Sequence, residues 1–292
     1  MELNNNMKDI TGDPKKAVKK LAYPIIISML LIMSNNLIDS IWVAGIGPEP
    51  LAAIGFVTPL FLILVGIGTG IGAGVNSLIS RYVGSKNQTK ANEAAVQSVV
   101  LGIIVSIIVT VIFVVILEPT LYIMGAKEVF NYAIDYGRPL FIFSMVTILP
   151  VAYAGIFRAE GDIKRATLPM CISAILNMIL DPIFIFGFHW GMAGAALATI
   201  IGQIISAALA VRYLMHYKTV AITRQHLRPR KDCVCRIAAL GAAQSFNQIA
   251  MTVVQIALNK SLTHYGAMSI YGEEIPLACA GIITKVNQIF FS

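Results

Sequence analysis

Long apolar stretches separated by short polar connections run along almost the whole chain. Each stretch holds about 20 or more mostly apolar residues, the length that an α-helix needs to cross the hydrocarbon core of a bilayer. Seven complete stretches are present, at residues 21–47, 51–79, 94–117, 136–157, 166–188, 192–214 and 237–262. An eighth begins near Ile275 and continues to Ser292. The pattern therefore predicts an all-α, polytopic membrane protein.

Composition and charge support this prediction and add an orientation. Hydrophobic residues make up 57% of the chain and charged residues 13%, and the mean hydropathy is +0.76. Most of the 22 Lys and Arg lie in the N-terminal arm and in the second, fourth and sixth connections. By the positive-inside rule these segments are cytoplasmic, in a multi-pass protein of the cell membrane whose N-terminal arm is not a signal peptide. The same asymmetry explains the net charge of +7, so we expect a lipid bilayer and no nucleic acid as the partner.

Two carboxylates stand inside the predicted spans, Asp39 in the first and Asp181 in the fifth, whereas the other Asp and Glu lie at span ends or in connections. A charge on a lipid-facing side of a helix costs several kcal/mol, so both side chains should face the interior of the bundle. At about 1.5 Å of rise per residue, each lies roughly 12 to 14 Å inward from the external end of its helix. The sequence therefore places the two carboxylates at one depth.

Neighbouring polar groups complete a candidate cation site at this depth. Asn177 precedes Asp181 by one helical turn on the same face, and Thr199 lies at a similar depth on the next span. Pro182 has no N–H to offer the Met178 carbonyl, which would leave that oxygen free for an ion or water. Carboxylate, amide and hydroxyl oxygens suit H⁺ or Na⁺. The alternative is that these side chains only link neighbouring helices.

A glycine-rich stretch, "GIGTGIGAG" at residues 66–74, lies in the second span. No strand precedes it and no Lys-Ser or Lys-Thr follows it, so it does not match a phosphate-binding loop. Its overlapping GxxxG spacings predict close packing against neighbouring helices or local bending.

Three stretches resemble characteristic segments of the multidrug and toxic compound extrusion (MATE) family. They are "SLISRYVGSKNQTKANEAAVQS" (residues 77–98), "FRAEGDIKRAT" (157–167) and "LNMILDPIFIFGFHWGMAGAALATIIGQ" (176–203). The resemblance runs from about residue 21 to the last residue. It implies a cation-coupled exporter with two lobes of six helices around a central cavity.

The resemblance also implies residue roles. In one branch of the family, the coupling ion binds to an aspartate on helix one, an Asn and an Asp one turn apart on helix five, and a Thr on helix six. The matching residues are Asp39, Asn177, Asp181 and Thr199, and we expect either H⁺ or Na⁺ there and no other cofactor. As supporting residues we expect Pro24, which resembles a proline at which helix one bends, Tyr136, which resembles a helix-four tyrosine near the site, and Met178 and Pro182.

An internal repeat suggests how the chain divides. "GPEPLAAIG" (residues 47–55), before the second span, recurs as "GEEIPLACAG" (272–281) before the eighth, as expected of repeats in transporters. We therefore expect an N-terminal lobe at residues 1–215, a cytoplasmic inter-lobe loop at 216–236, and the start of a second lobe at 237–292. Complete members of the family are longer, so the chain is expected to be truncated within helix eight.

Three functions are considered. The first is an antiporter, monomeric at full length and not an enzyme, that exchanges H⁺ or Na⁺ for organic or cationic drugs and toxic compounds. The second is a flippase for lipid-linked saccharides, which basic residues inside the cavity would favour; the first six spans have no internal Lys or Arg. The third is an intramembrane aspartyl protease using Asp39 and Asp181, although "ILDP" differs from the GxGD context of such enzymes. The chain could also be a fragment that does not transport.

Overall fold

The computed structural model of the chain describes residues 14–124, 126, 129–215 and 230–270. The predicted eighth span, most of the N-terminal arm and most of the inter-lobe loop lie outside these residues. Within them the structure is helical and contains no strand. The elements are α2 (Pro14–Ala44), α3 (Pro48–Gly84), α4 (Gln88–Ile123), α5 (Phe130–Ile142), α6 (Ser144–Ala159), α7 (Ile163–Pro182), the π-helical η1 (Ile183–Gly187), α8 (Gly191–Met215) and α9 (Lys231–Ala267).

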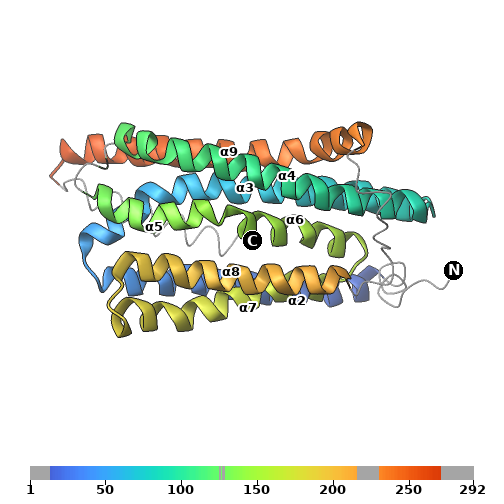
Figure 1. Cartoon of the computed structure of the whole chain (residues 1–292), viewed down its shortest axis with the longest axis horizontal. Helices are drawn as coiled ribbons and strands as arrows, with labels where there is room; N and C mark the ends of the chain where they lie inside the picture. Colours follow the sequence, from blue (N-terminus) through green and yellow to red (C-terminus); the bar gives the residue numbers. More distant parts are fainter. Residues whose placement is uncertain (1–13, 125, 127–128, 216–229, 271–292) are drawn as a thin grey trace.

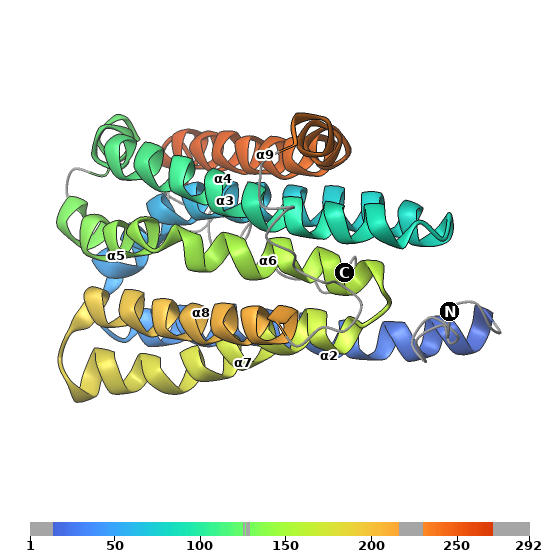
Figure 2. The ribbon, with the colours of Figure 1, turned by 45° about the vertical axis from the view of Figure 1, so that its right-hand side comes forward.

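The helices lie side by side in two groups joined by a middle layer. Figures 1 and 2 show α2, α7 and α8 together on one side, α3, α4 and α9 on the other, and α5 and α6 between them. Six of the described helices are long and apolar enough to cross a membrane, and α5 with α6 makes a seventh if the bent pair is one span. The predicted class, an all-α polytopic membrane protein, is confirmed.

The predicted fourth span, residues 136–157, is bent in the structure and is not one continuous helix. It consists of α5 and α6, which meet at Phe143 with a bend of 52°. At the bend, the buried Ser144 hydroxyl pairs with that of Thr110 on α4 at 2.5 Å. This contact involves residues 34 positions apart, so hydropathy along the chain did not reveal the break.

Several helices extend beyond the predicted apolar spans. α3 has 37 residues and α4 has 36, which at about 1.5 Å per residue gives roughly 55 Å, well above the approximately 30 Å of a hydrocarbon core. The residues added at the start of α4 are polar, and this start is capped by the Asn87 side chain, which accepts from the Lys90 N–H at 3.2 Å. The hydropathy pattern therefore predicted only the apolar middle part of α3 and α4, and not their full lengths.

The glycines of α3 lie on two faces and pack against two different helices. Gly68 and Gly72 face α6, where an added Cβ at Gly72 would lie 2.8 Å from the Val151 carbonyl oxygen. Gly66, Gly70 and Gly74 face α9, where Cβ atoms would meet Gln248, Ser245 and the Ile237 carbonyl. The close helix packing predicted from the GxxxG spacings is therefore confirmed.

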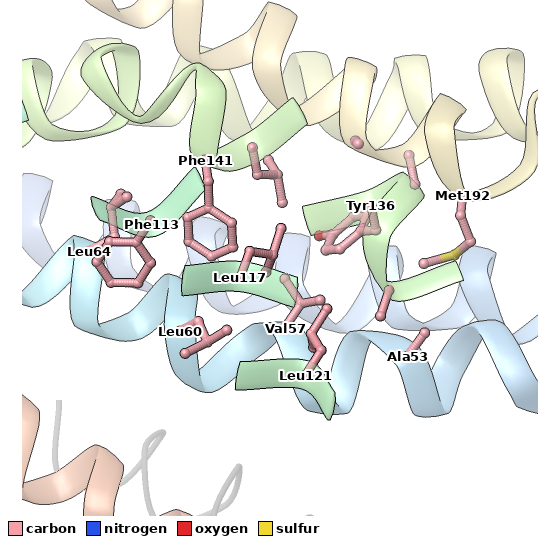
Figure 3. Packing of buried hydrophobic residues seen from close by; sticks show 14 of the residues in the cluster. Ala53, Val57, Leu60, Leu64, Phe113, Leu117, Leu121, Tyr136, Phe141 and Met192 are labelled. Atoms are coloured by element: carbon pink, nitrogen blue, oxygen red, sulfur yellow. The ribbon is translucent and has the colours of Figure 1, made fainter. Parts of the chain in front are cut away.

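A hydrophobic cluster fills the space between α3, α4 and α5. Figure 3 shows Leu60 and Leu64 of α3 facing Phe113 and Leu117 of α4, with Phe141 and Tyr136 of α5 alongside. The rings of Phe113 and Phe141 stack with their centroids 5.0 Å apart. This packing fixes α5, and so sets the position of the Tyr136 side chain.

Candidate functional site

The two carboxylates inside the spans meet where α2 packs against α7. Asp39 of α2 and Asp181 of α7 lie within hydrogen-bonding reach of each other, and Asp181 is fully buried at 0% exposure. Their equal depth, inferred from helix rise, agrees with this contact. The burial of an ionisable side chain in a bundle of apolar helices marks the position as a candidate functional site.

Asn177 connects this pair to α8. It lies one turn before Asp181, and its Nδ2 donates to Asp181 Oδ1 at 2.9 Å and to Thr199 Oγ1 at 3.2 Å. The Thr199 hydroxyl donates in turn to the Ala195 carbonyl at 3.1 Å. Asp39, Asn177, Asp181 and Thr199 therefore form one cluster that draws on three helices.

Tyr136 of α5 lies next to this cluster. Its hydroxyl lies near Thr199 and both carboxylates, and its buried side chain is held in the hydrophobic cluster seen in Figure 3. The residue suggested by family resemblance thus lies at the site.

The carboxylate pair lacks donors. Asp39 Oδ1 and Asp181 Oδ2 are buried and have no hydrogen-bond partner among the described residues. Ionised carboxylates only accept hydrogen bonds, and two of them in contact repel each other. A shared proton or a bound cation would remove that repulsion and satisfy the free oxygens. The arrangement can therefore bind and release one positive charge.

The other predicted residues divide between those near the cluster and those far from it. Pro182 ends α7 and is followed by the π-helical turn η1, a distortion that often occurs at functional sites. The predicted free carbonyl of Met178 remains a prediction. Pro24 lies fifteen positions before Asp39 within α2, roughly 22 Å along the helix, so it does not contact the site.

Sequence reasoning missed two polar residues of α2 beside the site. Asn35 Oδ1 and Trp42 Nε1 are buried and have no hydrogen-bond partner among the described residues. Asn35 precedes Asp39 by one turn and Trp42 follows it by three positions, so the three share one face of the helix. That spacing was visible in the sequence, but the polar neighbours of Asp181 were considered and those of Asp39 on α2 were not.

Comparisons with known proteins agree with the fold. The MatE family model matches residues 24–183. Among curated proteins, the chain is similar to the multidrug export protein MepA of Staphylococcus aureus, with 27% identity over 95% of this chain and 65% of that protein. MepA of Staphylococcus saprophyticus is 26% identical with the same coverage. The chain thus spans about 65% of the length of these relatives.

Solved structures are also similar over nearly the whole chain. A MATE crystal structure in the straight conformation has a TM-score of 0.89 and 31% identity, over 98% of this chain and 63% of that one. A MOP superfamily transporter from Pyrococcus furiosus has a TM-score of 0.90 and 30% identity, over 99% of this chain and 63% of that one.

Proposed function

This chain belongs to the MatE family of multi-pass membrane transporters, and on that basis we propose that it functions in the cation-coupled export of small organic compounds. The similar curated proteins are named multidrug export proteins, which supports drugs and other toxic compounds, cationic or amphipathic, as the substrate class. We place the protein in the cell membrane with its N-terminus in the cytoplasm, and we expect a monomer at full length.

The contact between Asp39 and Asp181 is the observation that carries the proposal. The two side chains lie on different helices, and their free oxygens lack a donor among the described residues. When H⁺ or Na⁺ binds, the repulsion within the pair disappears and α2 can pack closely on α7. When the ion leaves, the charged pair favours a looser or wetter arrangement. The ion therefore biases two conformations of the lobe, which is what coupling to substrate release requires.

Asn177, Thr199 and Tyr136 position the pair in this proposal. The Asn177 amide holds Asp181 and Thr199 through its two N–H groups. Loss of one hydrogen bond to a charged group costs about 1.5 to 3 kcal/mol. These residues therefore tune the affinity for the ion, whereas the carboxylates supply the charge.

The protein at its full natural length, reconstituted in vesicles, provides the test. Asp39→Asn and Asp181→Asn should each abolish dye export driven by an imposed H⁺ or Na⁺ gradient while leaving expression unchanged. Asn177→Ala should weaken coupled export less. Asp135→Asn is the matched control, since Asp135 is an exposed carboxylate one position from Tyr136, and it should export like the wild type.

One result would contradict the proposal that Asp39 and Asp181 form the coupling site. If both site variants export dye at the wild-type rate, with unchanged dependence on the gradient, then the carboxylates are structural and the coupling site lies elsewhere.

A further inference from the structure

α2 and α7 carry the same short pattern at the point where they meet. "NNLID" (residues 35–39) and "NMILD" (177–181) both place an Asn four positions before an Asp. An i,i+4 spacing puts each Asn on the same helix face as its Asp. Two helices thus bring equivalent Asn and Asp side chains to one interface.

Three contacts fix the direction of the two helices relative to each other. Asp39 meets Asp181, the rings of Trp42 and Phe186 are in edge contact at 6.2 Å, and a Cβ at Gly45 would lie 3.1 Å from the Phe186 ring. Positions that follow Asp39 therefore meet positions that follow Asp181, so the helices run parallel. One turn back from the carboxylates, Asn35 lies level with Asn177.

The two asparagines differ in how they are paired. Asn177 donates to Asp181 and Thr199. Asn35 Oδ1 is buried with no donor among the described residues, as are Asp39 Oδ1 and Asp181 Oδ2. Three buried acceptor oxygens without a donor are therefore carried by the faces of α2 and α7 on which Asp39 and Asp181 meet, and a buried acceptor left without a partner destabilises the folded protein.

We propose that Asn35 supplies a side-chain oxygen to the ion site between Asp39 and Asp181, and thereby makes it a site for Na⁺. A proton shared by the two carboxyl groups would satisfy their oxygens and leave Asn35 Oδ1 without a partner. A Na⁺ ion can accept several oxygens at once, so it satisfies all three. The inference rests on the proposed function and adds both a ligand and the identity of the coupling ion.

Trp42 offers a direct readout of ion binding. It lies three positions from Asp39 on the same face, and the chain has two tryptophans. The other, Trp190, is 50% exposed, so Trp190→Phe leaves Trp42 as the single reporter. In the purified chain, NaCl would be titrated against choline chloride at constant ionic strength, and ²²Na⁺ binding would be measured in parallel.

We expect saturable Na⁺ binding in the reporter protein and a tenfold or greater rise in the half-saturating Na⁺ concentration in Asn35→Leu. Asn35→Asp keeps the side-chain oxygen and replaces the NH2 group with a second oxygen, so at pH 8 it should bind Na⁺ at least as well as the Trp190→Phe reporter. Asn36→Leu changes an exposed neighbour and should have no effect. Circular dichroism would verify that each variant is folded.

The outcomes separate the two proposals. If Asp39→Asn and Asp181→Asn lose Na⁺ binding and Asn35→Leu keeps it, Asn35 is not a ligand although the carboxylate site stands. If Asn35→Asp binds Na⁺ as poorly as Asn35→Leu, the amide acts as a donor and the ligand assignment is wrong. If Trp42 responds to pH and not to Na⁺, the site takes a proton. If Asp39→Asn, Asp181→Asn and Asn35→Leu all bind Na⁺ as the reporter protein does, the proposed ion site itself fails.

Discussion

The crossing of α3 and α6 should be intolerant of a single added methyl group at Gly72. In Gly72→Ala the new Cβ would lie 2.8 Å from the Val151 carbonyl oxygen. The neighbouring atom belongs to the backbone of α6, so no side-chain rotation can relieve the contact. The two helices would have to separate, and the change should therefore destabilise the protein.

The size of the effect follows from this geometry. Ordinary van der Waals contact begins near 3.4 Å, so α6 must move by about 0.6 Å, and overpacking of this kind typically costs about 1 to 3 kcal/mol. Alanine is also the better helix former, by up to about 1 kcal/mol. Gly55→Ala is the reference variant. Gly55 is in the same helix and a Cβ there would have nothing within 4 Å, so comparison with this variant removes the contribution of helix propensity.

Thermal unfolding in detergent, followed by the loss of the folded size-exclusion peak, would measure the difference. Relative to Gly55→Ala, we expect Gly72→Ala to unfold at a midpoint lower by roughly 2 to 12 °C, taking about 2 to 4 °C per kcal/mol. Gly68→Ala should lie between the two, since its Cβ would sit 3.4 Å from Val151 Cβ. Equal midpoints for all three variants would refute the close approach of α3 and α6.

Two further outcomes are expected. In a cysteine-free background, a membrane-impermeant maleimide added to intact cells should label His189→Cys and should not label Asn87→Cys. The reason is that the positive-inside rule places residue 87 in the cytoplasm. Labelling of Asn87→Cys would contradict the orientation. Phe141→Ala should lower the free energy of unfolding by about 3 to 5 kcal/mol, since Phe141 is fully buried and stacked on Phe113. Ile142→Ala changes an exposed position and should cost much less. Similar losses in both variants would contradict the assigned core.

The sequence predicted the features that depend on local chemistry. Apolar length identifies spans whatever their partners are, because backbone groups in lipid must be satisfied within each helix. Helix rise alone placed Asp39 and Asp181 at one depth, and the structure brings them into contact. The part these residues play in coupling remains a prediction.

Features that depend on tertiary contacts were not predicted. The bend at Phe143 lies beside a hydrogen bond between Ser144 and Thr110, on a different helix, and neither residue is a helix breaker. Asn35 was overlooked because a neutral amide inside a span usually serves helix packing. Its significance depends on which helix it faces and on its lack of a donor, and neither follows from its place in the sequence.

The partners of the two glycine faces of α3 are synthesised at different times, because α6 precedes α9 along the chain. Ser245 of α9 donates to the Gly66 carbonyl at 3.3 Å across 179 residues of chain, and ribosomes add about 5 to 20 residues per second, so α9 follows α3 into the membrane roughly 10 to 35 s later. The α6 partner of Gly72 is made earlier. We therefore expect the α3–α6 crossing to form first, with lipid acyl chains occupying the groove at Gly66, Gly70 and Gly74 until α9 displaces them.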